Sequence, residues 1–459
     1  MTETIAAIST ATGSAGIGII KISGPEAISS TLSFFRQKNG QFLPEHDIVS
    51  HKMVYGWIIN PEQGNMLDEV LWVCMKSPHS YTGEDVAEIH THGSHVVLHS
   101  ILELLLKLPN VRLANPGEFT RRAYMNGRID LTHAEAVMDL ISAQSQKTLT
   151  LTTAHLTGQL KEKIQLMRQQ ILDCLAIIEA NIDFPDDMAE DQDDQDVQKS
   201  LKSIISKINQ YINDYYQTAI YRDGAKVVIV GKPNVGKSSL LNCLLGRDRA
   251  IVSNEPGTTR DIIDGQLSIA NVPVTLFDTA GIHISFDNIE QQGILRAKSL
   301  IKQANLILFV VEAGKAFTQD DWQVYNEIQN EPFILCANKV DCSDRKTINN
   351  VPDKCPVPIY ISALHRIGID QLKHDISEKI SCQNDELPSP EFMINLRQKN
   401  CLETAKNYIE QALSASFNLP LECSVIDIRL ALEALGDIIG IVHNEQLLDQ
   451  IFSSFCIGK

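Results

Sequence analysis

A stretch of eight residues, Gly231–Ser238 with the letters GKPNVGKS, has the spacing G-x-x-x-x-G-K-S of a phosphate-binding loop. It follows the apolar run KVVIV and precedes the helical segment SSLLNCLL, which is the strand, loop and helix order that such a loop requires. Gly231 and Gly236 allow backbone N–H groups to close around phosphates at a helix N-terminus. Lys237 can supply positive charge to the β and γ oxygens, and the Ser238 hydroxyl can bind Mg²⁺. The sequence therefore predicts a nucleoside triphosphate site.

Two later segments complete this site and select the base. Asp278 begins the segment DTAG after the run VTLF, so we expect it to hold the magnesium shell, while Gly281 senses the γ-phosphate. Asp341, in Asn338–Asp341 (NKVD), can accept from both N1–H and the 2-amino group of guanine. Adenine offers no such pair, so the predicted nucleotide is GTP. Ser362–Leu364 follows PIYI and fits the loop that reaches the guanine O6.

The sequence offers more than one candidate for the residue that activates the attacking water. Ile282 stands directly after DTAG, where small signalling GTPases carry a glutamine. An acid in the segment after DTAG, Asp287 or Glu290, could take this role, and Glu290 could equally be an acid on a surface helix. Arg260 could act as a trans-acting finger or form a structural pair with Asp261.

The spacing of apolar residues along the sequence predicts which helices and strands position these residues. From Lys226 to about Leu372, short β-branched runs alternate with helical segments, which indicates a parallel sheet with helices on both faces. Helical spacing dominates from about 131 to 221 and again from 392 to 455. We therefore expect a multidomain chain: an α+β domain at 1–126, a discontinuous α-helical domain at 127–223 and 381–459, and an α/β domain inserted at 224–380.

Composition excludes several classes of protein. The 459 residues carry a net charge of -17, which argues against a protein that coats nucleic acid or anionic membrane by bulk charge. The ten cysteines include no C-x-x-C pair, and the longest apolar run, Leu306–Val311, is far too short to span a membrane. We expect a soluble protein of the reducing cytoplasm. The acidic stretch Asp183–Asp196 is either a solvated loop or a cation or partner site.

Several longer segments resemble one family. The segments GKPNVGKSSLLN, EPGTTRD and DTAG occur together with PGEFTRRAYMNGRIDLTHAEAVMDLI, at 116–141, and with FSSFCIGK, at 452–459. This combination resembles the MnmE/TrmE family of tRNA-modification GTPases over essentially the whole chain. The resemblance implies an N-terminal folate-binding domain that also dimerises the protein, a discontinuous helical domain and an inserted G domain.

The resemblance also implies roles for individual residues of the nucleotide site. A potassium ion, in place of an arginine finger, would be bound by Asn234, by carbonyls of Ser253 and Glu255, and by Thr258, and would supply transition-state charge. Mg²⁺ would be bound by Ser238 and Thr259. Glu290 would be the general acid or base, and Lys237 would be a further catalytic residue. The expected nucleotide contacts are Asn234, Val235, Gly236, Lys237, Ser238, Ser239, Ser253, Asn254, Glu255, Pro256, Gly257, Thr258, Thr259, Asp278, Thr279, Ala280, Gly281, Asn338, Lys339, Asp341, Ser362, Ala363 and Leu364.

A folate pocket is implied as well. By motif its residues are Lys21, Glu88, Arg128 and the terminal Lys459, and Lys21 stands where arginine is commoner in the family. The cofactor would be 5,10-methylene- or 5-formyl-tetrahydrofolate. Cys456, in CIGK, would lie near the one-carbon unit, either as a nucleophile or as a packing residue.

Four histidines, at 90, 92, 95 and 99, could suggest a metal cluster, but no matching acid or cysteine spacing accompanies them and a helix face explains them equally well.

The implied function is a K⁺-dependent GTPase. With an FAD protein of the MnmG (GidA) type, in a heterotetramer built on a homodimer, it would install an aminomethyl or carboxymethylaminomethyl group at C5 of the wobble uridine of tRNA. Two alternatives stay open: a ribosome-assembly GTPase without modification chemistry, and a nucleotide-gated scaffold whose partner does all the chemistry. The first usually carries a basic or aromatic RNA-binding module, whereas the appended parts here are acidic and helical.

Overall fold

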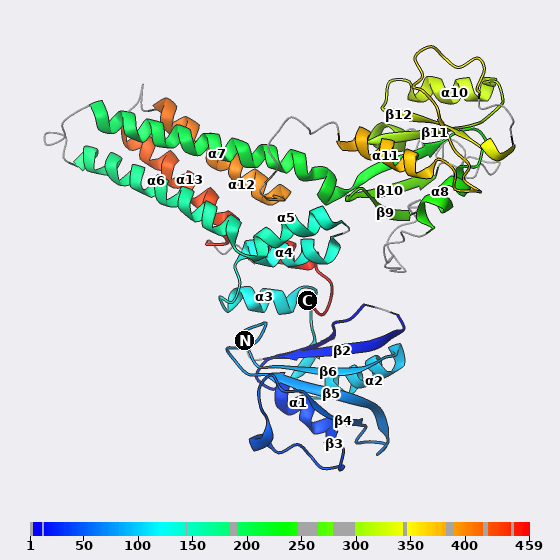
Figure 1. Cartoon of the computed structure of the whole chain (residues 1–459). Helices are drawn as coiled ribbons and strands as arrows, with labels where there is room; N and C mark the ends of the chain where they lie inside the picture. The colour runs from blue at the N-terminus through cyan, green and yellow to red at the C-terminus, as the bar shows by residue number, and fades with distance from the viewer. Residues whose placement is uncertain are drawn as a thin grey trace, which may run out of the picture. The chain divides into compact units, whose positions relative to one another are not determined.

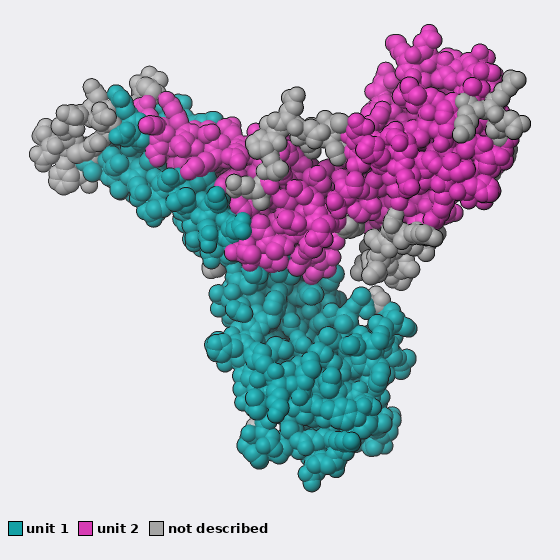
Figure 2. All heavy atoms as spheres, viewed as in Figure 1, with its two compact units in different colours: residues 1–138, 158–197, 407–459 teal, residues 139–157, 198–406 magenta. Residues whose placement is uncertain are grey.

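The chain divides into two compact units in the computed structural model, coloured teal and magenta in Figure 2. Unit 1 comprises residues 1–138, 158–197 and 407–459, and unit 2 comprises residues 139–157 and 198–406. Each unit is therefore assembled from segments that lie far apart in the sequence. The residues described are 3–11, 13–143, 145–183, 191–246, 265–278, 299–342, 347–381, 390, 392–415, 421–441 and 445–459.

The N-terminal part of unit 1 is built on a seven-stranded sheet with the order β3-β4-β5-β6-β2-β1-β7 (Figure 1). All neighbouring strands pair antiparallel except β1 and β7, which are parallel. The strands are β1 Thr4–Ile8, β2 Ala15–Ser23, β3 Phe35–Gln37, β4 Val54–Ile59, β5 Met66–Met75, β6 Val86–Gly93 and β7 Val111–Leu113. The helices are α1 Ala27–Phe34, α2 His95–Leu106 and α3 Glu118–Met125, with a short 3-10 turn, η1, at Glu45–Asp47.

Alternation along the strands decides which side of this sheet is the core. Ile20 and Ile22 of β2 point to the face covered by α1 and α2, where they are fully buried together with Trp72. Lys21 between them points to the opposite face, where Phe119 of α3 packs. The predicted α+β character of this part of the chain is confirmed.

Helices make up the rest of unit 1 and part of unit 2, as the periodicity predicts. Within unit 1, α6 packs against α13, and Arg168 Nε donates to the carbonyl of Leu432 at 3.3 Å. Within unit 2, Arg222 at the end of α7 donates to the carbonyl of Ile394 at 2.9 Å. That bond joins the segment that enters the second sheet to the segment that leaves it. The helices are α4 Leu131–Ser142, α5 Gln146–Leu156, α6 Gln159–Asp183, α7 Asp191–Asp223, α12 Leu396–Ala415, α13 Leu421–Ile439 and α14 Glu445–Ser453.

Unit 2 contains a six-stranded sheet with the order β13-β12-β11-β8-β10-β9. The predicted parallel sheet is confirmed: β8, β10, β11, β12 and β13 are parallel, and one antiparallel edge strand, β9, pairs with β10. Strand β9 was not predicted, because its alternation of buried Leu267 and Ile269 spans too few residues to be distinguished from a loop. The strands are β8 Ala225–Val230, β9 Gly265–Ile269, β10 Val272–Asp278, β11 Leu306–Glu312, β12 Phe333–Asn338 and β13 Ile359–Tyr360.

Helices cover both faces of the second sheet, as predicted. Val227 and Ile229 point into a core shared with α8 and α11, whereas Val228 and Val230 point into a second core shared with α10. The helices are α8 Lys237–Leu245, α10 Gln319–Ile328 and α11 Ile369–Ser381, with a 3-10 turn, η3, at Val340–Cys342. No helix among the described residues combines the length and apolar character that crossing a membrane would require.

Candidate functional site

The predicted phosphate loop lies between β8 and α8, as its motif requires. Gly231 and Gly236 have φ angles of +150° and +99°, which disfavour residues with a side chain. A Cβ on Gly231 would meet the carbonyl of Val310, and one on Gly236 would meet the side-chain amide of Asn338. Glycine is therefore required at these two positions for the loop to pack against β11 and Asn338, and α8 presents its N-terminus to the loop.

Lys237 and Ser238, the first two residues of α8, contact the residues that their roles require. Lys237 Nζ donates to the carbonyls of Gly231 at 2.7 Å and Lys232 at 2.9 Å. Burial lowers the pKa of Lys237, and the charge of Asp278 acts in the opposite direction. Ser238 Oγ donates to Asp278 Oδ2 at 2.7 Å. A hydroxyl and a carboxylate oxygen side by side are the hard oxygen ligands that suit Mg²⁺.

The predicted base-reading segment is tied to the phosphate loop through its first two residues. Asn338 is buried, donates to the carbonyl of Val235 at 2.9 Å and accepts from the N–H of Ala363 at 3.0 Å. Lys339 Nζ donates to the carbonyl of Asn234 at 2.7 Å. The three loops that should surround one nucleotide are thus joined by direct hydrogen bonds.

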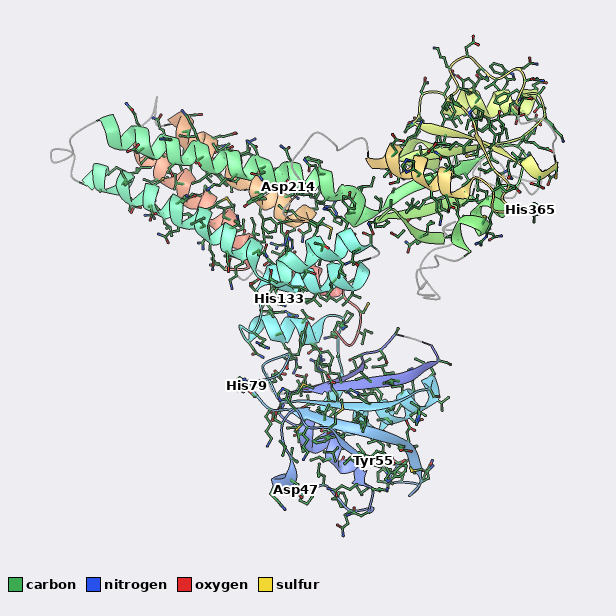
Figure 3. The ribbon with its side chains drawn as sticks, viewed as in Figure 1. Asp47, Tyr55, His79, His133, Asp214 and His365 are labelled. Carbon is green, nitrogen blue, oxygen red and sulfur yellow. The ribbon has the colours of Figure 1, made fainter. Side chains whose placement is uncertain are left out.

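Asp341, the residue predicted to read guanine, lies in η3 beside the loop that begins at Ser362. Hydrogen bonds from the Ser362 side chain and then from Cys342 lower the pKa of Asp341, so it is a carboxylate near neutral pH and can accept two bonds from a base. His365, labelled in Figure 3, has its Nε2 at 3.8 Å from Asp341 Oδ2. Leu364 is largely exposed, as is Ser239 on α8.

Part of the predicted catalytic apparatus lies outside the described residues, and its assignments stay predictions. This holds for the acid Glu290, its alternative Asp287, and the residues Ile282, Arg260 and Asp261. It also holds for the predicted ligands Ser253, Asn254, Glu255, Pro256, Gly257, Thr258, Thr259, Thr279, Ala280 and Gly281.

Three of the four predicted folate residues influence one another in unit 1. Lys21 and Glu88 are directly opposite in the β2–β6 pairing. Burial lowers the pKa of Lys21, with the charge of Glu88 raising it and that of Lys459 lowering it further. The Lys21 ammonium lies 4.4 Å from the centre of the Tyr81 ring and 5.4 Å from that of Phe119. Two cations and one carboxylate therefore share a partly apolar site.

The last residues of the chain bind along the edge of this site. The carbonyls of Cys456 and Lys459 accept from the N–H groups of Gly117 at 3.4 Å and Phe119 at 3.2 Å, and that of Gly458 accepts from Ser9 Oγ at 3.1 Å. These contacts use backbone atoms, so the exposed Cys456 thiol is left available for chemistry.

Arg128, the fourth predicted folate residue, donates from Nε to the carbonyl of Ser80 at 3.2 Å. This bond connects Arg128 to the segment that carries Tyr81.

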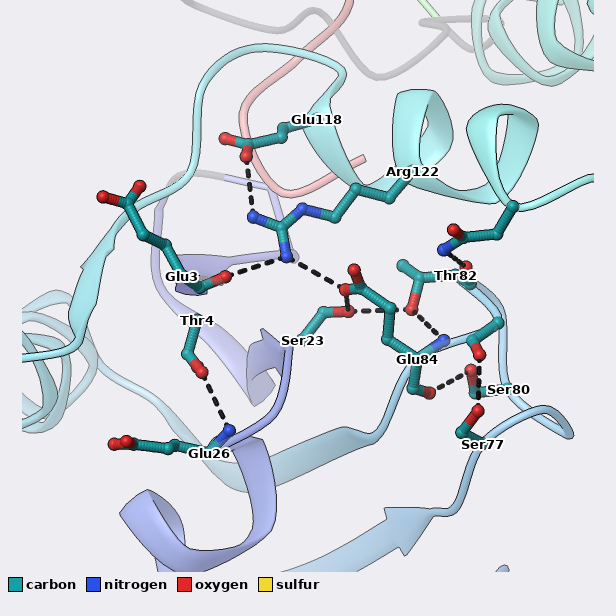
Figure 4. A network of polar contacts seen from close by, with 12 residues as sticks. Glu3, Thr4, Ser23, Glu26, Ser77, Ser80, Thr82, Glu84, Glu118 and Arg122 are labelled. Carbon is teal, nitrogen blue, oxygen red and sulfur yellow. Dashed lines mark hydrogen bonds and ion pairs between the residues drawn. The ribbon is translucent and has the colours of Figure 1, made fainter. Parts of the chain in front are cut away.

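A buried ion network, which was not predicted from the sequence, is centred on Arg122. Arg122, only 1% exposed, donates to Glu84 and Glu118, both at 2.9 Å (Figure 4). Burial would raise the pKa of Glu118, but hydrogen bonds from Arg112, from the Asn115 N–H and from Arg122 lower it to about 2. The i,i+4 spacing of Glu118 and Arg122 in a helix was the signal that could have found the pair. The network supports the turn to which the tail binds.

The four histidines considered as a metal cluster do not form one. His90 Nε2 lies 3.1 Å from Glu88 Oε2, and His92 Nδ1 lies 2.7 Å from Asp68 Oδ1. His95 and His99 stack on one face of α2, with ring centres 4.1 Å apart. Among the described residues, the group that brings three potential ligands close together is elsewhere, at His374, Asp375 and Glu378 on α11.

Two family models match this chain. The family model of the MnmE helical domain matches residues 131–456, and the model of the GTP-binding protein TrmE N-terminus matches residues 4–128. Proteins named tRNA modification GTPase MnmE match over the full chain. That of Carboxydothermus hydrogenoformans is 39% identical over 463 residues, covering 100% of both chains, and that of Alkaliphilus oremlandii is 40% identical over 461 residues, covering 100% of this chain and 99% of the relative.

Among solved structures, Era bound to MgGDPNP and part of 16S ribosomal RNA is 30% identical over 40% of this chain and 66% of that chain, with a TM-score of 0.28. Since that score is too low to carry a structural argument, the assignment depends on the sequence matches. From these matches and the geometry of the phosphate loop, we conclude that the chain belongs to the MnmE (TrmE) family of tRNA modification GTPases and is a GTP hydrolase.

Proposed function

We propose that this GTPase modifies C5 of the wobble uridine of tRNA to aminomethyl or carboxymethylaminomethyl forms, using a tetrahydrofolate one-carbon unit. It acts with an MnmG-type FAD protein, in a heterotetramer built on a homodimer, in the cytoplasm. The observation that carries the proposal is the C-terminal tail, whose Lys459 lies within electrostatic range of the partly buried Lys21 on β2. A GTPase that acts only as a molecular switch would not need this second site, formed by Lys21, Glu88 and Lys459, in addition to its nucleotide site.

In the folate site, each group has a chemistry that suits part of the cofactor. Glu88 can accept hydrogen bonds from the N–H edge of a pterin ring, and the rings of Tyr81 and Phe119 offer apolar surface to it. Lys21, Lys459 and Arg128 would face the anionic and carbonyl groups of 5,10-methylene- or 5-formyl-tetrahydrofolate. The cofactor supplies the carbon unit when bound, and these residues bind and orient it.

Cys456 is proposed as the residue that meets the one-carbon unit. Its thiol is exposed while its carbonyl is held by Gly117, which fixes the backbone without occupying the sulfur. A Cys456→Ser variant should lose tRNA modification and keep GTP hydrolysis. Cys355→Ser, in the unit that carries the nucleotide site, is the control and should affect neither activity.

GTP hydrolysis is proposed to depend on two cations. Mg²⁺ would be bound by Ser238 and Thr259, with Asp278 holding its shell, and K⁺ by Asn234 together with Ser253, Glu255 and Thr258. Glu290 would orient or deprotonate the attacking water, while Lys237 balances the phosphate charge. GTP turnover measured in K⁺ and in Na⁺ tests the potassium assignment, and equal rates in the two salts would contradict it.

The domain organisation proposed for this activity keeps the predicted boundaries. Residues 1–126 form the folate-binding and dimerisation domain, and 224–380 form a G domain inserted between the helical segments 127–223 and 381–459. The bond from Arg222 to Ile394 supports the insertion, because it brings together the two ends at which the G domain joins the helices.

Wobble-uridine nucleosides, measured in tRNA from a strain that lacks this protein, provide the decisive test. We expect the modified nucleosides to disappear, and to return with the wild-type chain but not with Lys21→Met or Lys459→Met. Lys107→Met, which removes an exposed lysine paired with Glu62 at 2.8 Å, is the matched control and should restore modification. An unchanged nucleoside profile in the deletion strain would refute the proposed reaction.

A further inference from the structure

Lys232, which follows the first glycine of the phosphate loop, makes contacts that the motif does not explain. Its side chain leaves the loop and reaches the start of α10, where Nζ donates to Asp321 Oδ2 at 2.8 Å and to Thr318 Oγ1 at 3.0 Å. The side chain of Lys232 is 16% exposed and that of Asp321 is 2% exposed. The ion pair is therefore largely removed from water, where an unpaired charge is costly.

Asp321 is itself rigidly fixed. Its Oδ2 accepts from the N–H of Thr318 at 2.9 Å and from the Thr318 hydroxyl at 2.7 Å, in the first turn of α10, where the helix dipole favours a negative charge. No donor among the described residues lies within hydrogen-bonding distance of the buried Oδ1. Lys232 is the cation paired with this carboxylate, so the Asp321 charge holds the lysine in one place.

The backbone of Lys232 carries this constraint to the nucleotide site. Its carbonyl accepts from Lys237 Nζ at 2.9 Å, next to the carbonyl of Gly231 at 2.7 Å. A continuous chain of direct contacts thus runs from Asp321 through Lys232 to the Lys237 ammonium. If Lys232 moves, Lys237 loses one of the two acceptors that hold its ammonium in the loop.

We propose that Lys232 and Asp321 are positioning residues for Lys237 in GTP hydrolysis. Neither side chain is among the predicted nucleotide contacts. Together they fix the loop carbonyls that aim the Lys237 ammonium at the β- and γ-phosphates, where charge develops in the transition state. A displacement of about 1 Å at such a position can cost roughly 100-fold in rate. Since the Lys237 charge is needed most where charge develops in the transition state, loss of the Lys232–Asp321 pair should lower kcat more than it weakens GTP binding.

The test measures kcat and KM for GTP hydrolysis by the full chain. Lys232→Met and Asp321→Asn should each lower kcat at least 10-fold while KM changes by less than about 3-fold. The Lys232→Arg variant, which keeps the positive charge, should retain most of the wild-type kcat. Lys302→Met and Asp320→Asn are matched controls that each remove an exposed charge from the same domain. Asp320 is the residue next to Asp321. Both controls should leave kcat unchanged.

A double variant separates positioning from general stability. If the two residues act through one contact, Lys232→Met combined with Asp321→Asn should lower kcat no more than either change alone. Multiplicative losses in the double variant would overturn the proposal. So would single variants that lower the melting temperature but keep kcat within 2-fold of wild type once corrected for the folded fraction.

Discussion

Replacing Arg122 by methionine should destabilise the N-terminal sheet region much more than replacing its neighbour Arg121. Arg122 is buried, and its guanidinium donates to Glu84, to Glu118 and to the carbonyl of Glu3 at 3.1 Å. Methionine fills much of the space but leaves two carboxylates without this partner.

The expected loss follows from what each carboxylate retains. Removing one partner from a buried ion pair costs roughly 3–5 kcal/mol. Glu118 keeps Arg112, at 2.6 Å, and Glu84 keeps the Ser23 hydroxyl, at 2.9 Å, so we expect the lower end, about 3 kcal/mol. With a urea m-value of about 1–3 kcal/mol/M, the unfolding midpoint should fall by roughly 1–3 M.

Tryptophan fluorescence can follow this region separately from the other unit. Trp72 is fully buried in the N-terminal core, where Nε1 donates to Thr31 Oγ1 at 2.8 Å, and Trp57 lies on β4 of the same sheet. Trp322, on α10, is the third tryptophan of the chain. A Trp322→Phe background therefore makes urea unfolding report on the N-terminal region, which matters because a multidomain chain need not unfold in one step.

Arg121→Met is the matched control. Arg121 pairs with Asp449 at 2.9 Å, but Asp449 is largely exposed, and such surface pairs contribute about 0–1 kcal/mol. The two variants remove the same chemical group from adjacent positions. If their urea midpoints agree, the buried network does not stabilise the fold and the reasoning fails.

Three further outcomes can be checked. The pKa of Glu118 in the fold is about 2, below its ordinary value near 4.5. The ionised carboxylate therefore stabilises the N-terminal region above about pH 4.5, and this contribution is lost as the pH falls toward 2. Acid titration followed by circular dichroism should show Arg122→Met unfolding at a higher pH than the wild-type protein. Gly458→Ala, at φ +93° and with a Cβ against the carbonyl of Ile8, should release the tail and lower folate affinity at least 10-fold by calorimetry, with GTP turnover retained as its control. Gly236→Ala should abolish GDP binding in a fluorescent-nucleotide assay, since its Cβ would meet Asn338; normal affinity would contradict the loop geometry.

Local patterns predicted most of the fold. The runs that became β8, β10, β11 and β12 are short, apolar and bounded by turn residues, and a buried parallel strand needs little else. Strand β9 was not predicted, because an edge strand is defined by the strand with which it pairs, here β10, more than by its own residues.

The nucleotide site was predictable because its residues are close in sequence and their order is fixed by the ligand. Other features depend on contacts between distant segments. The local sequence TRR does not show that Arg122 is buried while Arg121 forms a surface ion pair. The partner of Arg122, Glu84, and the partner of Arg121, Asp449, both lie far away in the sequence. Lys232 likewise looked like a variable position of a motif, and its role depends on Asp321, 89 residues away.

The tail at 456–459 imposes an order of events on the making of this protein. The first sheet can form as soon as its own strands have left the ribosome, but Gly117 and Phe119 gain their hydrogen-bond acceptors only when residues 456–459 have been translated. Until then Gly117 and Phe119 offer their amides to water alone. A polypeptide that stalls before position 456 would contain the described nucleotide-binding residues but lack the segment that borders the proposed folate site, so such a product would separate GTP hydrolysis from the proposed folate chemistry.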